Sequence, residues 1–198
     1  MDYFNTRLGR VQTEAELRLQ GVVMQPDVLS ALGLFPVEYP EPQHDPTYYT
    51  LEPSGSPHPK DGDSTRYVQD FSVVPRELST AKAVKLAELS AVFDQAQATG
   101  HTLSVCGFEV DANETADRNV RGLITKLEAT GAPSTPFCDY TNTMRQATLA
   151  QLKTIQLEII GYGEALYARK WALREAVNSA EAVDDVVAVT VSFDGVGA

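Results

Sequence analysis

The sequence has few cysteines and lacks a long apolar run. Its 198 residues include two cysteines, Cys106 and Cys138, which are too far apart for a CxxC motif. With no sign of secretion, reduced thiols are the expected state. No apolar stretch reaches the length of a membrane span, and the N-terminal segment lacks the features of a signal peptide. We therefore expect a protein of the cytosol with no membrane partner.

Basic residues are also scarce. Sixteen Lys and Arg stand against 27 Asp and Glu, so the formal net charge is −11. A nucleic-acid backbone would be repelled by this charge, and the scattered basic residues form no face that could lie on an anionic membrane. We expect no nucleic-acid partner. A chain of this length buries roughly 70% of its unfolded surface, so no metal is required for stability.

A change in composition divides the chain near Pro75. Proline and glycine interrupt the sequence before this point, whereas long periodic segments follow it. The sequence predicts an α+β fold with two parts. Residues 1–75 would form an N-terminal attachment region with short helices and a small antiparallel β-sheet. Residues 76–198 would form a mainly helical domain with an inserted β-hairpin and long antiparallel helices.

In the N-terminal region, TEAELRLQ predicts a short helix with Thr13 and Glu16 at capping-box spacing, and QPDVLSALG predicts another. LFPVEY is typical of an extended segment. YPEPQHDP, residues 39–46, has too many prolines for a central strand and predicts an exposed arm. TYYTLE and TRYVQDFSVV predict two strands joined by a long loop, PSGSPHPKDGD.

In the C-terminal region, apolar spacing predicts an amphipathic helix over residues 76–99 that ends at Gly100. HTLSV and FEV flank Cys106-Gly107 and predict a tight hairpin. Asp111 and Glu114 have capping-box spacing and predict the start of a helix that ends at Gly131. The segment APSTPFCDYTN reads as a broken loop.

A long helix is predicted from the capping pair Thr148 and Gln151 to about Asn178, followed by a short helix and an extended tail. Its apolar residues follow a near-heptad rhythm that Arg169 interrupts: Leu152, Ile155, Ile159, Tyr162, Leu166, Leu173 and Val177. This pattern requires a helical partner, either in the same chain or in another copy, and the sequence leaves both open. With Trp171 beside the rhythm, we predict an oligomer or a stable heteromeric assembly.

The residues with chemical potential all have ordinary structural explanations. His101 and Cys106 would lie roughly 15 Å apart along one strand, too far for a nucleophile and its base. His44, Asp45 and His58 lie in Pro-rich segments without close ligand pairs. These observations favour a protein without a catalytic cysteine or a metal site.

Two further patterns resemble catalytic motifs only superficially. Alternation places Glu109 and Asp111 on one exposed strand face, where hydration explains both carboxylates. GYGEA, residues 161–165, lies inside a helix and lacks the Lys that follows a phosphate loop, so its glycines indicate close packing or a kink. We expect no enzyme and no cofactor.

Aromatic residues of the N-terminal region are the first candidates for partner binding, because they bury a large area at small entropic cost. Tyr48 and Tyr49, with Tyr67 and Phe71, could instead be the core of a small sheet. The full set of predicted contact residues also includes the long helix: Tyr3, Phe4, Tyr39, Tyr48, Tyr49, Ile159, Leu166 and Trp171.

Two long segments carry a family resemblance. Residues 88–131, from ELSAVFDQ to KLEATG, and residues 140–189, from YTNTMRQ to DDVVAV, resemble the C-terminal domain of unassigned function in phage tail-fibre and tail-associated proteins. In that domain a helix leads to a hairpin, a capped helix, a polar segment and a long helix. Residues 28–52 and 66–92 look like its usual front region. Thr141-Asn142 and Phe137-Cys138 depart from the usual Asp-Asn and tryptophan segments.

The resemblance implies a setting rather than a chemistry. It suggests a non-enzymatic structural component of a phage tail, associated with the fibre or baseplate and acting through contacts with other tail proteins. Such a protein would lie in the virion tail, and in the host cytoplasm before assembly. A tail-fibre assembly chaperone is the alternative. A glycan hydrolase would require a carboxylate pair that the sequence lacks.

Overall fold

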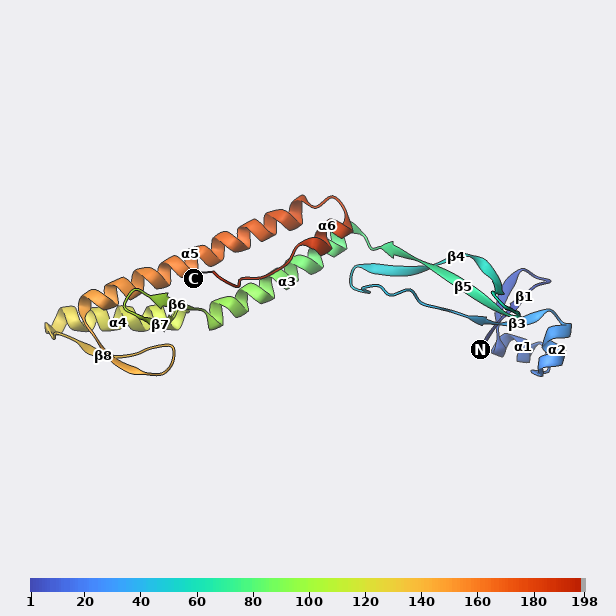
Figure 1. The fold of residues 1–198 in the computed structure, drawn as a ribbon, viewed down its shortest axis with the longest axis horizontal. Helices are drawn as coiled ribbons and strands as arrows, with labels where there is room; N and C mark the ends of the chain where they lie inside the picture. The colour runs from blue at the N-terminus through green and yellow to red at the C-terminus, as the bar shows by residue number, and fades with distance from the viewer. Residues whose placement is uncertain (197–198) are drawn as a thin grey trace. The chain divides into compact units, whose positions relative to one another are not determined.

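The chain folds into two compact units, as the computed structural model of residues 1–196 shows (Figure 1). The first unit is Met1–Arg76 and the second begins at Glu77, one residue beyond the predicted boundary. Strands dominate the first unit and helices the second. The predicted α+β class is therefore confirmed.

The N-terminal unit is built on a five-stranded sheet with the order β2-β1-β3-β5-β4. The strands are β1 (Asp2–Asn5), β2 (Arg10–Thr13), β3 (Leu34–Glu38), β4 (Tyr49–Lys60) and β5 (Asp63–Pro75), and the helices are α1 (Glu14–Leu19) and α2 (Pro26–Ala31). The β3–β5 pair is parallel and the other pairs are antiparallel. The sheet is therefore mixed, whereas the sequence predicted an antiparallel one.

A small core holds this unit together. Leu17 of α1 and Leu29 of α2 pack with Tyr3 and Leu34 of the sheet. Thr13 and Glu16 make the predicted capping box, with the Thr13 N–H donating to the Glu16 carboxylate at 2.7 Å. The first residues of the chain thus belong to the core.

The predicted loop PSGSPHPKDGD is largely strand. Strands β4 and β5 form one long hairpin that turns at Asp61-Gly62, where Gly62 has φ 78°. Because β4 is at the edge of the sheet, its prolines need not donate to a further strand, and this edge position explains why the prolines are tolerated. Residues 39–46 form a loop, as predicted.

The C-terminal unit contains three long helices and two hairpins. Its elements are α3 (Leu78–Thr99), β6 (His101–Ser104), β7 (Phe108–Asp111), α4 (Glu114–Thr130), β8 (Thr135–Cys138), β9 (Met144–Ala147), α5 (Leu149–Ser179) and α6 (Val183–Ala188). Helix α5 runs back along α4 and then α3 (Figure 1). Lys153 pairs with Glu128 at 2.7 Å at one end, and the Lys82 Nζ donates to the Asn178 carbonyl at 2.7 Å at the other. These contacts lie at the two ends of the antiparallel arrangement.

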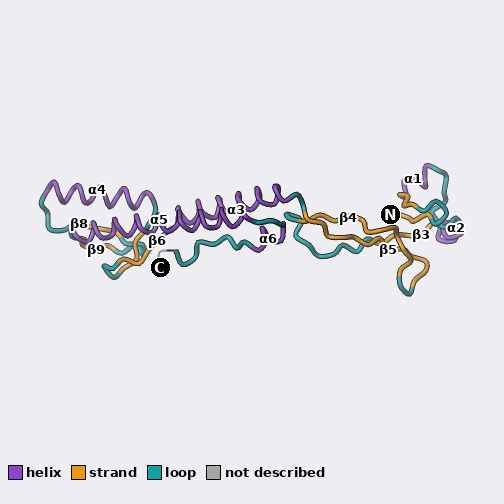
Figure 2. The backbone as a smooth tube through the Cα atoms, turned by 90° about the horizontal axis from the view of Figure 1, so that it is seen from above, coloured by secondary structure: helices purple, strands orange, loops and turns teal. Residues whose placement is uncertain are grey.

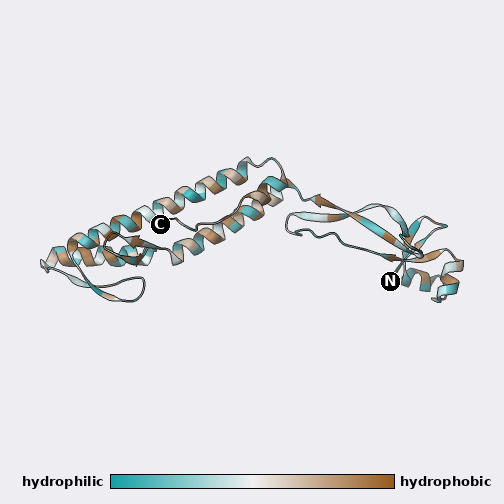
Figure 3. Ribbon diagram, viewed as in Figure 1, coloured by the Kyte–Doolittle hydropathy of each residue, from teal (hydrophilic) through white to brown (hydrophobic). Residues whose placement is uncertain are grey.

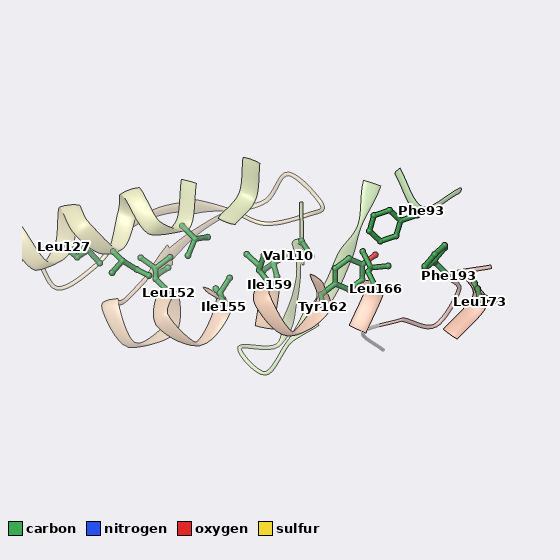
Figure 4. Close-up of a cluster of buried hydrophobic side chains, with 14 of the residues drawn as sticks. Phe93, Val110, Leu127, Leu152, Ile155, Ile159, Tyr162, Leu166, Leu173 and Phe193 are labelled. Carbon is green, nitrogen blue, oxygen red and sulfur yellow. The ribbon is translucent and has the colours of Figure 1, made fainter. Parts of the chain in front are cut away.

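The near-heptad residues of α5 are covered inside the chain. Leu152, Ile155 and Ile159 pack with α4 residues such as Leu127, while Leu166 lies near Phe93 of α3 (Figure 4). The structure thus resolves the alternative that the sequence left open, because the partner helices of this face are α3 and α4.

Two segments differ from the sequence prediction. The broken segment before α5 contains a second hairpin, β8–β9, whose turn places Asn142 at φ 61°. Asparagine tolerates this left-handed conformation better than most residues. After α6, residues 189–196 contain no strand: residues 189–193 have no regular structure and residues 194–196 form a turn, and the segment is drawn as loop in Figure 2.

The start of α4 is displaced from the prediction. Its N-cap is Asn113, whose side chain accepts from the Ala116 N–H at 2.9 Å, and Asp111 ends strand β7 instead. The predicted capping role of Asp111 is therefore wrong, because the hairpin extends through that residue. The predicted end at Gly131 and the Thr148–Gln151 capping box are confirmed.

Replacement of the α4 cap should destabilise the protein. Asn113→Ala removes the acceptor for the Ala116 N–H and is expected to lower the free energy of unfolding by about 0.5–2 kcal/mol. Asn113→Ser should retain most of this stability. Urea denaturation followed by circular dichroism measures the difference. A larger loss in Asp111→Ala than in Asn113→Ala would contradict the assignment.

Gly100 is required by a close approach rather than by an unusual backbone. Its φ of −62° is open to any residue, but a Cβ built there would lie 2.4 Å from Tyr162 Cε1. The buried Tyr162 ring lies across this position, and its hydroxyl donates to the Ala96 carbonyl at 3.4 Å. The sequence predicted a helix terminator here and missed the tyrosine.

Gly100→Ala should therefore cost about 1–3 kcal/mol of stability through overpacking. Gly161→Ala is the matched control, because no atom lies within 4 Å of a Cβ at that helical position. It should stabilise α5 by about 0.5–1 kcal/mol. Thermal and urea denaturation of both variants check the contrast. Equal effects of the two substitutions would show that the Tyr162 contact does not constrain Gly100.

Candidate interaction surface

The C-terminal unit exposes an apolar face on its longest helix. Leu157, Ile160, Tyr167 and Trp171 are 69%, 39%, 49% and 62% exposed and follow helical spacing. Helical geometry places all four on one side of α5, away from its buried residues. We call these four residues the α5 outer stripe. Figure 3 shows that α5 carries apolar and polar residues side by side along its length.

The surrounding structure holds the stripe in place. The Tyr167 ring lies edge-on to the buried Phe93 ring, with centroids 5.1 Å apart. The Arg174 guanidinium lies 5.4 Å from the Trp171 ring centroid, within cation–π range. Because α5 is anchored on α3 and α4 along its opposite side, the stripe is a preformed surface.

The predicted contact residues of α5 divide between core and surface. Ile159 and Leu166 are buried, 5% and 1% exposed, so their use as partner contacts is wrong in this fold. Trp171 is exposed, as a contact residue must be. Sequence reasoning missed Leu157, Ile160 and Tyr167, although their spacing relative to Trp171 was a readable signal.

Most predicted contact residues of the N-terminal unit are also internal. Tyr3, Phe4 and Tyr48 are buried, and Tyr49 is half-buried at the start of β4. The use of Tyr3 and Phe4 as anchors is wrong because the first strand lies between β2 and β3 instead of forming a free arm, and the use of Tyr48 is wrong because its side chain is buried. The contact role of Tyr49 stays a prediction. Tyr39 is 40% exposed, but its hydroxyl donates to the Asp2 carboxylate at 2.8 Å. Burial and this hydrogen bond raise the pKa of Tyr39 to about 12.

Other large apolar side chains are exposed in this unit. Leu19 at the end of α1 is 89% exposed and Val23 is 54% exposed. They were not singled out in the sequence, where Leu19 belongs to the predicted helix and carries no distinguishing pattern. With the predicted anchors Tyr3, Phe4 and Tyr48 buried, Leu19, Val23 and Tyr39 are among the residues of this unit that are exposed enough to contact a partner.

The two hairpins of the C-terminal unit pack on each other around polar contacts. The Tyr140 ring stacks on His101, with centroids 4.2 Å apart, and the Tyr140 N–H donates to the Glu109 carbonyl at 3.0 Å. Arg145 lies 4.4 Å above the Phe108 ring. His101 is thus an aromatic packing residue.

Asp139 organises the β8–β9 turn. Its side chain, only 1% exposed, accepts from Arg145 Nε at 2.6 Å, from the Thr143 N–H at 2.9 Å and from the Thr141 hydroxyl at 2.8 Å. Burial opposes the charged form, but these hydrogen bonds and the Arg145 charge outweigh it and lower the pKa of Asp139 to about 2. The Asp139 carboxylate therefore stabilises the hairpin through these hydrogen bonds.

One histidine, His58, lies beside a carboxylate. His58 Nε2 lies 3.0 Å from an Asp70 carboxylate oxygen across the β4–β5 hairpin. Its hydrogen bonds to the Pro59 carbonyl and to Asp70 raise the pKa of His58. Within residues 1–196, no group of three or more His, Cys, Asp or Glu is placed to hold a metal ion. Over the same residues, both cysteines are free thiols.

Two shallow grooves flank α5. One, of about 580 Å³, lies between α3, Tyr162 and residues 191–196, and includes His101 and Glu109. The other, of about 550 Å³, lies beside the start of α4 and includes Asp94, Glu114 and Asp117. The first groove also contains Ser192, whose hydroxyl donates to the Asp194 carboxylate at 2.7 Å, and neither groove contains a cysteine among the described residues. No helix among these residues has the length and apolar character to span a membrane.

The Asp139 cluster predicts a pH dependence of stability. Because the folded pKa of about 2 lies below the unfolded value of about 3.9, the stabilisation is complete above about pH 5 and is lost as pH falls through the folded pKa. Asp139→Asn should be less stable than wild type at neutral pH, and the difference should shrink across this window. Urea denaturation between pH 2 and 7 checks it. A difference independent of pH would contradict the assigned pKa.

Comparison with known proteins gives one match. Residues 80–191, more than half of the chain and nearly all of the C-terminal unit, match the model of a family described as "Domain of unknown function (DUF4376)". No curated protein and no solved structure is significantly similar to the chain. The matched range includes α4, both hairpins, α5 and nearly all of α3. The chain belongs to the DUF4376 family.

Proposed function

We propose that the protein is a non-enzymatic structural component of a bacteriophage tail, associated with the fibre or baseplate and acting through contacts with other tail proteins. Such a protein lies in the virion tail, after a period in the host cytoplasm. The resemblance of residues 88–131 and 140–189 to tail-associated proteins supplies the setting for this proposal.

Large apolar side chains are exposed on helices of both units, and this observation supports a role in protein contacts. Leu19 and the α5 outer stripe are examples. Exposed apolar groups in an acidic chain are suited to protein contacts, and repulsion from nucleic acid is expected at a net charge of −11. Polar side chains of the two C-terminal hairpins have structural partners: His101 stacks on Tyr140, and the Asp139 carboxylate accepts from Arg145 and from the Thr143 N–H.

The proposal assigns attachment to the N-terminal unit. Leu19 and Val23 lie outside its small core, so a partner could cover them without unfolding the sheet. A deletion of residues 1–12 would be a poor test, because it removes β1 from the middle of the sheet. Substitutions in the full chain separate attachment from folding.

The test follows the tagged protein into purified particles of the phage or prophage that encodes it. Wild type should remain with the tails. Leu19→Glu with Val23→Glu should leave the circular dichroism spectrum unchanged but remove the protein from particles. Leu103→Glu, at an exposed site of the C-terminal unit, is the matched control and should be retained.

Three results would contradict this assignment. Wild-type protein bound to fibres in lysates but absent from purified particles would indicate an assembly chaperone. Absence from both would reject a tail role. Retention of the Leu19 and Val23 variant would place the attachment surface elsewhere.

A further inference from the structure

We infer that the α5 outer stripe binds a second copy of the chain, with the two α5 helices antiparallel and centred on Glu164. This inference is independent of the proposed tail role. The predicted reason for an oligomer, the near-heptad face, does not apply because α3 and α4 cover that face. The stripe on the other side of α5 supplies a different reason.

The stripe is complementary to itself in size. In a two-fold antiparallel pair, residues equally far before and after the centre lie at the same level of the interface, and they face each other where both lie close to the central line of the contact. Leu157 and Trp171 are equally far from Glu164, so each tryptophan would lie on a leucine of the second copy. This contact occurs twice in the dimer, once on each side of the axis.

The other residues near the centre meet on either side of this line. Helical geometry places Tyr167 and Ile160 on the same side of the line through Glu164 and at similar distances from the two-fold axis, so the tyrosine ring would lie on an isoleucine of the second copy. Gly161 and Ala168 lie on the other side, where small residues allow the two helices to approach. Gly161 is exposed, and no atom lies within 4 Å of a Cβ built on it.

Charge selects the antiparallel direction. Lys153, whose ammonium also pairs with Glu128 of its own chain at 2.7 Å, and Glu175 are both exposed and equally far from Glu164, so opposite charges would meet at each end of the antiparallel contact. A parallel pair would instead place Lys153 beside Lys153 and Arg174 beside Arg174, which is unfavourable. In both the parallel and the antiparallel pair, the Glu164 carboxylates of the two copies lie close together. Their repulsion limits the affinity of the dimer.

The expected dimer is weak. The contact is one helix pair about 33 Å long, from Lys153 to Glu175, and lies at the small end of specific interfaces. The net charge of −11 on each chain adds a repulsion that salt would screen. Association is therefore expected at micromolar concentrations, with higher affinity as ionic strength rises.

Disulfide cross-linking tests the direction. In a Cys106→Ser, Cys138→Ser background, Lys153→Cys and Glu175→Cys are prepared as two separate full-length proteins. Each alone should remain uncross-linked under oxidation, because identical positions lie about 33 Å apart in the antiparallel dimer. The mixture should form a disulfide-linked pair. A cross-link within either single protein, or none in the mixture, would overturn the inference.

Sedimentation of the full chain from about 1 µM to about 1 mM, the range of weak interfaces, tests the surface. Leu157→Ala should weaken the dimer roughly tenfold or more, because each dimer loses two contacts. Leu103→Ala is the matched control, since Leu103 is 67% exposed on β6, and should leave association unchanged. Glu164→Gln should strengthen the dimer. A monomer throughout, or equal effects of the two leucine substitutions, would overturn the inference.

Discussion

The burial of one face of α5 is the constraint on which the C-terminal unit depends. The helix has 31 residues, and neither α3 nor α4 is long enough to cover it alone. The chain places α4 along its first half and α3 along its second half, and the β6–β7 hairpin makes the connection between them. This arrangement buries seven residues of α5, and six of them, from Leu152 to Leu173, belong to one continuous core.

The two hairpins pack against the helices that are held in this way. Strand β6 starts where Gly100 passes directly against the Tyr162 ring of α5, and only a residue without a side chain fits there. On the next turn of α5, Glu158 accepts a hydrogen bond from the hairpin backbone. The β8–β9 hairpin packs in turn on β6–β7 through Tyr140 and Arg145. The polar residues named in these segments therefore stabilise the packing of the hairpins.

Because one face of α5 is used internally, the opposite face determines what the unit presents to other molecules. A buried carboxylate such as Asp139 has its hydrogen bonds satisfied within the turn, whereas Leu157 and Trp171 remain accessible to solvent. An anchored helix loses little conformational entropy when it binds, and this favours weak but specific protein contacts. The N-terminal unit has its own smaller core and its own exposed residues, so each unit can make separate contacts.

The sequence by itself determined the features that depend on local physics. The capping boxes at Thr13 and Thr148, the end of α4 at Gly131 and the periodicity of α3 and α5 are set within a few residues, and each was predicted correctly. The tertiary structure decided which apolar residues are covered. Large apolar residues occur both in protein cores and at binding surfaces, so residue type alone did not distinguish the two for Tyr3, Phe4, Ile159 and Leu166. Strands and helices distant in sequence bury these four residues. The strand character of β4, the β8–β9 hairpin and the need for Gly100 likewise arise from neighbours that local patterns do not contain.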